Sequence, residues 1–575
     1  MGFQQWAAET GFAHSRFKAL WSASKQALIG ITVILLAVIA GLGAVYFIST
    51  SDEIDGYSYL GAIGGIACLV IIIAIRGWNM VGDVLPIFPA KYSSAPGAAR
   101  LGNLKDLKKA GLVDYRRWFW PWGTTIDRRQ QIYCGQFEKR SVYYGGNRMI
   151  VTTGPTRAGK GMRMLVPNIK MLTNRPLFII DPKAELTKMT FNFRRKLGPA
   201  IIINPYNVLG LGSAGFNPLI DPTFTPKSLE FASRAAGLAE ARVRKEGPGV
   251  AQHWTNRARA LDTSVILYTK LTERATAPAT MGDVMEILGS PYDSTQNGAL
   301  TLKKVLEKAH AHPERELSNL AGQFLTDNAT NEMRATISTL NGHIWPLNDK
   351  AIIADMAKHP MLLLNGKKVP FDFRMMKDHI FTVYVILPDT KLKTHSVWLR
   401  MLVSCALRAL MDGVPGLYRP LLMLDEAGNL DHLEPLENAM SMGAGKGITV
   451  WPAFQSLEQI KQIYGASGMQ TFLSAAGVLN SFAPSNDLET ARYLSERCGT
   501  RTAVIRNYAD QPGVEGQSKV YSPQSFPLMR PEDVSGMRDG VLLNLIDHVP
   551  PLLLDAPGYW EFCGKDLDEN PYYRP

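Results

Sequence analysis

The amino-acid sequence predicts an α/β core that is interrupted by an all-helical domain and preceded by two membrane-spanning helices. Three observations support this architecture. Two uncharged apolar stretches lie near the N-terminus, short β-branched runs alternate with helical periodicity over most of the remaining chain, and the strand-like runs vanish between about Pro222 and Leu340. At 575 residues the chain is too long for one simple core, and its 46% apolar content excludes a mostly disordered protein.

The charge and the cysteines limit the class of protein. A net charge of +11 suits an anionic partner such as nucleic acid or anionic lipid, but the positive flanks of a membrane segment would explain it equally well. The five cysteines are widely spaced, odd in number and form no C-x-x-C pair. This pattern argues against a disulfide framework or a zinc module and favours a reducing compartment.

Two uncharged runs, residues 27–49 and 57–75, are each about as long as a bilayer requires. A signal peptide would be shorter, and no second span would follow it. Basic residues lie outside both runs (Arg16, Lys18 and Lys25 before the first; Arg76, Lys91 and Arg100 after the second), and the short link between the runs is acidic. The positive-inside rule therefore predicts a transmembrane hairpin over residues 1–80 with both chain termini in the cytoplasm.

The segment GPTRAGKG, residues 154–161, resembles a phosphate-binding loop in all but its last residue. The usual pattern ends in Ser or Thr, whose hydroxyl helps to hold Mg²⁺, whereas this chain has Gly161. A β-branched run, RMIVTT, precedes the loop, and GMRMLVPNIKML follows it with helical spacing. This context predicts a P-loop that binds ATP through Gly154, Pro155, Thr156, Arg157, Ala158, Gly159, Lys160, Gly161 and Met162, with Lys160 on the outer phosphate oxygens.

Hydrolysis also requires a carboxylate on Mg²⁺ at the end of a buried strand, and two segments offer one. PLFIIDPKAE places Asp181 at a strand end, and PLLMLDEAGN places Asp425 and Glu426 at another. Only the second provides adjacent acids, so Asp425 is predicted to hold Mg²⁺ through its water shell and Glu426 to polarise the attacking water. Asp181 is expected to be a strand-end residue near the loop.

A further apolar strand, GITVWPAF, ends at Gln455. Its side chain could sense the γ-phosphate, although a glutamine at a helix start is equally often an ordinary surface or capping residue. The order of loop strand, acidic strand and glutamine strand predicts a RecA-like P-loop NTPase domain. The 265 residues between Lys160 and Asp425 exceed what that core needs, so something is inserted.

The insertion is predicted to be an all-α domain over residues 222–340. It divides the nucleotide-binding domain into a first part, residues 81–221, and a second part, residues 341–575. The inserted segment carries several basic residues, which could contact an anionic substrate or only line solvated helix faces: Arg242, Arg244, Lys245, Arg257, Arg259, Lys303 and Lys304.

With these motifs in place, the sequence resembles the coupling proteins of type IV secretion systems, the TraG-type conjugation ATPases. The resemblance covers nearly the whole chain and rests on an ordered series of motifs: the two-span anchor, GPTRAGKG, IIDPKAEL, INPYN with FNPL, HWTNRA, TVYVILPD, LMLDEAGNL, FQSLEQI and the closing PPLLL and YW. A glycine after the loop lysine is common in this family, so the resemblance implies that GKG is a variant and that Mg²⁺ relies more on water and Asp425.

The resemblance further implies a homo-hexameric motor in the bacterial inner membrane. Such a motor links a relaxase bound to single-stranded DNA, or effector proteins, to the inner-membrane components of the secretion system, in some cases through adaptors. Some members carry a trans-acting arginine between the acidic strand and the glutamine. Here that stretch offers only Lys446, and the arginine stays unassigned.

Three alternatives remain open from the sequence. The chain could be a coupling protein for effectors alone. It could also be a passive docking receptor that binds ATP and hydrolyses little, which the absence of a hydroxyl at Gly161 favours. A chromosome translocase is disfavoured by the helical insert and by the lack of a long linker and a terminal winged helix.

Overall fold

The computed structural model describes residues 99–572 except 118–119, 125, 246–249, 275, 295, 297–298, 326–329, 365, 485 and 511–516. Both predicted membrane spans, 27–49 and 57–75, lie outside the described residues. Within the described part, no helix combines the length and the apolar character needed to cross a bilayer.

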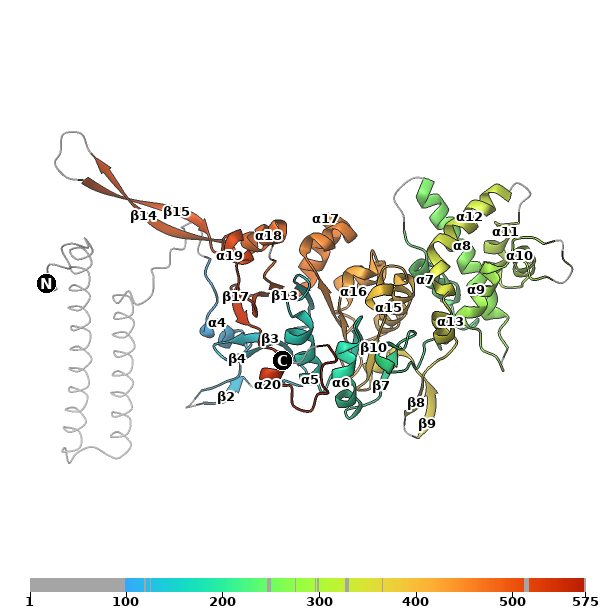
Figure 1. Cartoon of the computed structure of the whole chain (residues 1–575), viewed down its shortest axis with the longest axis horizontal. Coiled ribbons are helices and arrows are strands. Elements are labelled where there is room, and N and C mark those ends of the chain that lie inside the picture. Colours follow the sequence, from blue (N-terminus) through green and yellow to red (C-terminus); the bar gives the residue numbers. More distant parts are fainter. Residues whose placement is uncertain are drawn as a thin grey trace, which may run out of the picture. The chain divides into compact units, whose positions relative to one another are not determined.

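The core is a mixed sheet of eleven described strands in the order β4-β3-β17-β16-β13-β5-β12-β11-β6-β10-β7 (Figure 1). Seven neighbouring strands pair in parallel: β13 (Ala476–Phe482), β5 (Met149–Thr153), β12 (Thr449–Phe454), β11 (Leu421–Leu424), β6 (Leu177–Ile180), β10 (Thr382–Val385) and β7 (Ala200–Ile203). Antiparallel strands extend one side: β16 (Val541–Ile546), β17 (Leu552–Asp555), β3 (Ile132–Phe137) and β4 (Arg140–Tyr144).

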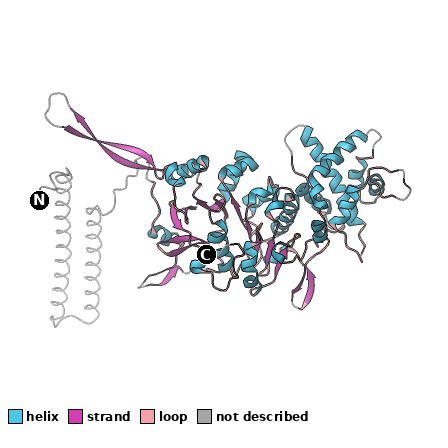
Figure 2. Cartoon of the chain, in the orientation of Figure 1, coloured by secondary structure: helices cyan, strands magenta, loops and turns pink. Residues whose placement is uncertain are grey.

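The parallel strands are apolar throughout because helices cover both of their faces. In β6, Phe178 and Ile180 join the core on one face, whereas Leu177 and Ile179 join the core on the other. The first face packs against α15 (Ser396–Met411), α16 (Glu434–Met442), α17 (Leu457–Ala475) and α18 (Leu488–Cys498). The second packs against α4 (Leu104–Lys109), α5 (Val166–Met171) and α6 (Glu185–Arg195). The predicted α/β P-loop core is thus confirmed in its layers (Figure 2).

Between β7 and residue 360, the named elements of the described chain are all helical (Figure 2). The α-helices among them are α7 (Phe231–Arg242), α8 (Val250–Leu271), α9 (Met281–Gly289), α10 (Leu302–His310), α11 (Arg315–Gly322), α12 (Thr330–Ile344) and α13 (Lys350–Met356). The long helix α8 contacts α7, α9, α10, α11 and α12 and so forms the centre of this helical domain. Thr280 and Thr301 cap α9 and α10 by accepting hydrogen bonds from backbone amides of the first turn.

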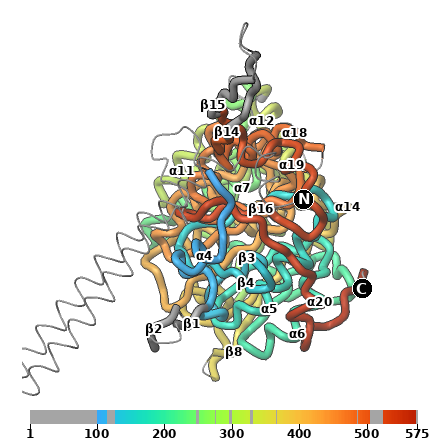
Figure 3. Tube along the Cα trace, turned by 90° about the vertical axis from the view of Figure 1, so that its left-hand side faces the viewer, coloured from blue at the N-terminus to red at the C-terminus, as the bar shows by residue number. Residues whose placement is uncertain are grey.

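Three two-stranded hairpins, which the sequence did not predict, complete the described part of the fold. They are β1–β2 (Tyr115–Arg117 and Trp120–Thr124), β8–β9 (Met361–Leu364 and Lys367–Pro370) and β14–β15 (Thr500–Asp510 and Gln517–Pro527). The base of the hairpin β14–β15 lies next to α18 and α19 (Pro531–Ser535), and its strands project away from these helices (Figures 1 and 3). Short helices α14 (Asp389–Leu392) and α20 (Tyr559–Phe562) account for the remaining α-helical residues of the described chain.

Two of the basic residues in the helical domain, Arg242 and Arg259, make contacts within the protein. Arg242 is fully buried and forms an ion pair of 2.9 Å with the equally buried Asp262 of α8. Arg259 donates hydrogen bonds to the Val243 carbonyl at 2.9 and 3.1 Å. Arg242 is therefore a structural residue of the helical domain and is unavailable to an anionic substrate, contrary to one of the two possibilities that the sequence left open.

The Arg242–Asp262 pair generates a stability prediction. Burial raises the pKa of Asp262 to about 6, against the pull of the arginine. Asp262→Asn leaves the arginine charge buried and unpaired, so we expect the free energy of unfolding to fall by about 3–5 kcal/mol. The double variant Arg242→Met with Asp262→Leu removes both charges and should recover most of that loss. Thermal unfolding of the purified chain measures both variants, and an unchanged midpoint for Asp262→Asn would contradict the assignment.

Candidate active site

The phosphate-binding loop connects β5 to a helix whose first turn, Lys160–Leu165, is of the π type and continues into α5. The loop requires left-handed backbone at Arg157 (φ 67°) and Gly159 (φ 88°). A Cβ atom on Gly159 would lie 2.7 Å from Arg163 Cδ, whereas one on Gly161 would meet only Leu186 Cδ2, at 3.6 Å. Gly159 is thus fixed by backbone conformation and space, and Gly161 is not.

Lys160 is buried in the loop, with 7% of the residue exposed. Its Nζ donates hydrogen bonds to the Gly154 and Pro155 carbonyls at 2.6 and 3.2 Å. Burial lowers the pKa of Lys160, and the negative charges of Glu426 and Asp425 oppose that shift. The two carboxylates, far away in sequence, are therefore close enough to the loop lysine to interact with its charge.

Strand pairing brings the carboxylates to the loop. In the parallel sheet β12 lies between β5 and β11, with Ala453 opposite Thr152 and Pro452 opposite Leu424. Asp425 follows β11 directly. Burial, reinforced by the neighbouring Glu426, raises the pKa of Asp425 to about 7, and Lys160 opposes the rise. Such a carboxyl group loses its proton most readily when a cation is near.

Glu426 and Gln455 are in direct contact. Gln455 follows β12, and its Nε2 donates to Glu426 Oε2 at 3.2 Å. The Gln455 backbone amide is fixed by a 2.9 Å hydrogen bond to Gln459 Oε1 in the first turn of α17. Glu426 itself has left-handed backbone (φ 57°), which turns the chain sharply after β11 into a 3₁₀ turn, Ala427–Leu430. The structure therefore brings together Lys160, Asp425, Glu426 and Gln455.

Asp181 has a local structural role. It follows β6, the next strand beyond β11, and is almost fully buried. Its Oδ2 accepts hydrogen bonds of 2.7 Å from both the amide and the hydroxyl of Thr187 in α6. Burial raises the pKa of Asp181 to about 6. These contacts hold the start of α6. Because Asp181 is occupied in this way, Asp425 and Glu426 are the better candidates for binding Mg²⁺ and activating water.

The fold also brings to the site residues that no motif in the sequence places there. Lys183 is close enough to lower the pKa of Asp425. Near the C-terminus, Asn570 Nδ2 donates to Glu185 Oε1 at 2.7 Å and lies 3.2 Å from Met162 Sδ. Tyr572 donates to the Lys183 carbonyl at 3.1 Å. Nothing in local spacing links residue 570 to residue 162, so only the tertiary structure reveals this contact.

Lys446 lies at the opposite edge of the sheet. It precedes β12, whereas Gln455 follows that strand, and its Nζ donates to the Gly413 carbonyl at 3.3 Å. In this chain it is therefore not part of the loop site. Among the described charged groups that shift the pKa values of Lys160 and Asp425, none is an arginine.

The residues present fit a magnesium–nucleotide complex. Magnesium is commonly bound through one or two carboxylates, water and substrate phosphates, and Asp425 supplies a carboxylate beside the phosphate-binding loop. The described residues contain no cluster of three or more His, Cys, Asp or Glu side chains that could hold a metal without a nucleotide.

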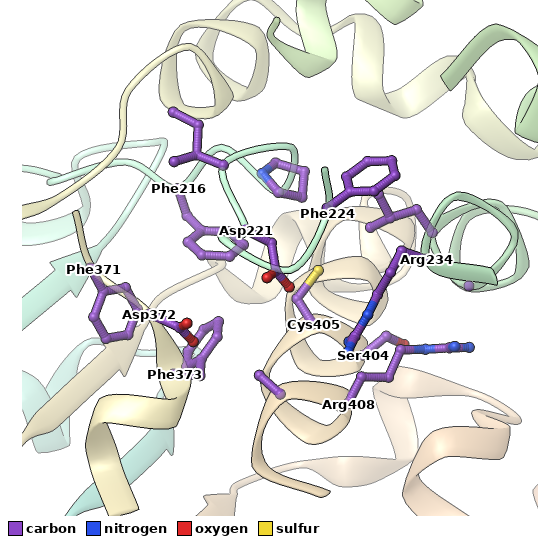
Figure 4. A pocket seen from close by; sticks show the side chains of 15 residues that line it. Phe216, Asp221, Phe224, Arg234, Phe371, Asp372, Phe373, Ser404, Cys405 and Arg408 are labelled. Atoms are coloured by element: carbon purple, nitrogen blue, oxygen red, sulfur yellow. The ribbon is translucent and has the colours of Figure 1, made fainter. Parts of the chain in front are cut away.

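A separate cavity lies at the junction of the core and the helical domain (Figure 4). It is lined by side chains from α7 and the segment before it, from residues 371–373 and from α15. They include Phe216, Asp221, Arg234 and Cys405. Its volume of about 40 Å³ admits water but not a nucleotide. Arg374 holds its wall together through Asp221 at 3.2 Å, Asp372 at 2.9 Å and Asp412 at 3.0 Å. This cavity is a packing feature of the domain junction.

The fold and the loop site together define a P-loop NTPase core. The family model for type IV secretory system conjugative DNA transfer matches residues 101–568. The chain belongs to this family.

Individual relatives agree with that assignment. The chain is 25% identical over 470 residues to the conjugal transfer protein TraG of Escherichia coli, a match that covers 76% of this chain and 70% of the relative. It is 27% identical over 472 residues to protein VirD4 of Agrobacterium fabrum, covering 81% and 66%. The VirD4 of Rhizobium rhizogenes is matched over only 58% of its length, at 27% identity.

Solved structures agree in fold. The unbound bacterial conjugative coupling protein TrwB, without its N-terminal 70 residues, matches with a TM-score of 0.55 and 14% identity over 80% of this chain and 94% of that one. TrwB has also been solved with the non-hydrolysable ATP analogue ADPNP and with ADP and Mg²⁺, at TM-scores of 0.54 and 0.53 and 14% identity, covering 81% of this chain and 96% of TrwB.

Proposed function

We propose that this chain is a membrane-anchored ATPase of a type IV secretion system that recruits substrate to the secretion channel and drives its transfer. The observation that carries the proposal is the convergence of Lys160, Asp425, Glu426 and Gln455 at one edge of the sheet, in a chain of the conjugative DNA transfer family. Lys160 binds the phosphates, Asp425 holds Mg²⁺ through water, Glu426 polarises the attacking water, and Gln455 contacts Glu426 and senses the γ-phosphate. ATP and Mg²⁺ are the proposed cofactors, as in the TrwB complexes.

The proposed substrate is a relaxase–single-stranded DNA complex, with or without separate effector proteins. The conjugal transfer proteins and the conjugative coupling protein among the relatives support DNA transfer. A homo-hexamer and an inner-membrane location belong to the same proposal. They rest on the family and on the two apolar runs at the N-terminus.

The loop geometry predicts different outcomes for three neighbouring substitutions. Lys160→Ala should weaken ATP binding by about 10- to 100-fold, since a charged hydrogen-bond donor contributes about 1.5–3 kcal/mol. Gly161→Ser should retain or increase hydrolysis, because its Cβ has room and its hydroxyl restores the usual Mg²⁺ ligand. Gly159→Ala should lose binding, because φ is +88° and Arg163 occupies the space. Nucleotide titration and phosphate release measure these effects, and equal activity of the Gly159 and Gly161 variants would contradict the loop geometry.

Glu426→Gln tests the motor itself. The amide retains the shape and the hydrogen-bonding capacity of the side chain but cannot polarise water, so hydrolysis should fall by about 10²–10⁴-fold while ATP stays bound. In a ring whose subunits act in turn, mixed assemblies stall, and the variant should suppress DNA transfer by wild-type cells. Titrating variant against wild type and counting transfer events distinguishes the models. A passive docking receptor predicts transfer strictly proportional to the amount of wild-type protein.

The proposed anchor is tested by topology. A reporter that fluoresces only in the cytoplasm, fused after Pro575, should be active, and so should one fused before Met1, because basic residues flank the outer ends of both apolar runs. A matched fusion within the acidic link at Asp55 should be silent. Activity of a periplasmic reporter after Pro575 would refute the topology.

A further inference from the structure

The loop that carries Glu426 contains two non-glycine residues with positive φ, Glu426 and Asp431. We call residues 425–431 the carboxylate loop. Glu426 has φ 57° and ψ 44°, and Asp431 has φ 50° and ψ −161°. The second combination lies close to a region that is essentially confined to glycine, so Asp431 persists there only because its surroundings impose it. Strain of this kind concentrates at functional and switching segments.

Arg400 of α15 supplies part of that constraint. The residue is 2% exposed. Its Nη1 donates to the carbonyls of Leu430 at 2.9 Å and His432 at 2.8 Å, on either side of Asp431. Its Nε donates to the carbonyl of Ala241, in the last turn of α7, at 3.2 Å. One guanidinium group therefore joins the carboxylate loop to the end of the first helix of the helical domain.

Arg244 makes a second connection between the same two segments. It follows α7 by two residues, and its Nη1 lies 2.6 Å from Asp431 Oδ2. Its Nη2 donates to Ser396 Oγ, at the start of α15, at 2.5 Å. Both Arg244 and Asp431 are about 40% exposed at the side chain, so this pair, unlike Arg400, can break without unfolding the core. Tyr464 of α17 donates to the Asp431 carbonyl at 3.2 Å and fixes the other side.

The helix α7 is also tied to α15 away from the carboxylate loop. Arg408 pairs with Glu240 at 2.7 Å, and Arg234 pairs with Asp412. Figure 4 shows Arg234 and Arg408 reaching toward the same junction from α7 and α15. Because α7 packs along α8, the centre of the helical domain, a displacement of the helical domain would move the end of α7 and, through Arg244 and Arg400, the carboxylate loop.

We propose that Arg244 and Arg400 couple the helical domain to the position of Glu426, so that substrate engaged by the helical domain sets the rate of ATP hydrolysis. The inference rests on the proposed ATPase function. Both arginines are positioning residues, since they contact the loop that carries Glu426 and not the nucleotide site. The Arg244–Asp431 pair is the adjustable contact, and Arg400 is the fixed one.

The experiment measures ATP hydrolysis by the full chain in detergent with and without single-stranded DNA. Arg244→Gln and Asp431→Asn should keep basal kcat within about twofold and lose most of the stimulation by DNA. Arg244→Lys, which keeps the positive charge, should retain the stimulation by DNA. Arg408→Gln is the matched control, because it removes another partly exposed link between α7 and α15 that does not touch the carboxylate loop. It should be stimulated like the wild type.

Two results would overturn the coupling. One is normal stimulation of both Arg244→Gln and Asp431→Asn. The other is an equal loss in Arg408→Gln, which would mean that the contacts only stabilise the domain junction. If the wild type hydrolyses no ATP, the proposed function is refuted. The coupling can then still be tested by amide hydrogen exchange. DNA should change exchange of residues 427–432 in the wild type but not in Arg244→Gln. Insensitivity of both hydrolysis and exchange to DNA in the wild type would refute the inference.

Discussion

The parallel pairing of β5, β12 and β11 is the constraint on which the site depends. Strands that run in the same direction end at the same edge of a sheet, and the segments after these three strands carry the four predicted site residues: Lys160 after β5, Gln455 after β12, and Asp425 and Glu426 after β11. The register fixes their separation, because Thr152 is opposite Ala453 and Leu424 is opposite Pro452. A strand shifted by one residue would reverse its side chains and leave the lysine without its carboxylates.

Burial gives these groups their chemistry. At this edge of the sheet, desolvation disfavours the charged form of both Lys160 and Asp425. It lowers the pKa of the lysine and raises the pKa of the aspartate. Each charge is favoured by the other. A phosphate–magnesium complex would add a partner for both, so the site is electrostatically suited to that ligand before it binds. Asp181, which is 1% exposed, instead accepts hydrogen bonds from Thr187 and stabilises the turn into α6.

The helical domain shares an apolar core with the sheet, and arginine contacts connect it to the loop at this edge. Arg242 is fully buried and stabilises the helical domain from within, whereas Arg244, two residues further on, reaches the carboxylate loop. The difference between the two arginines is one of position relative to the end of α7. A hydrophobic contact at the same place would hold the domains together, but it would not fix the backbone carbonyls of Leu430 and His432 in the way that the Arg400 guanidinium does.

The sequence by itself determined the elements and the chemistry of the core. The glycines of GPTRAGKG, the β-branched run before them and the adjacent acids after an apolar strand each have a local physical signature, so the loop, Asp425 and Glu426 could be named in advance. The strand order predicted that Gln455 ends its strand beside the loop, whereas its contact with Glu426 came from the structure. The membrane hairpin, which lies outside the described residues, stays a prediction from length and charge. Only the tertiary structure decided how Arg242 and Arg244 differ, that Lys446 lies at the far edge of the sheet, and that Asn570 contacts Met162 and Glu185. Spacing cannot predict such contacts, because they join segments up to about four hundred residues apart whose proximity is set by packing and not by local periodicity.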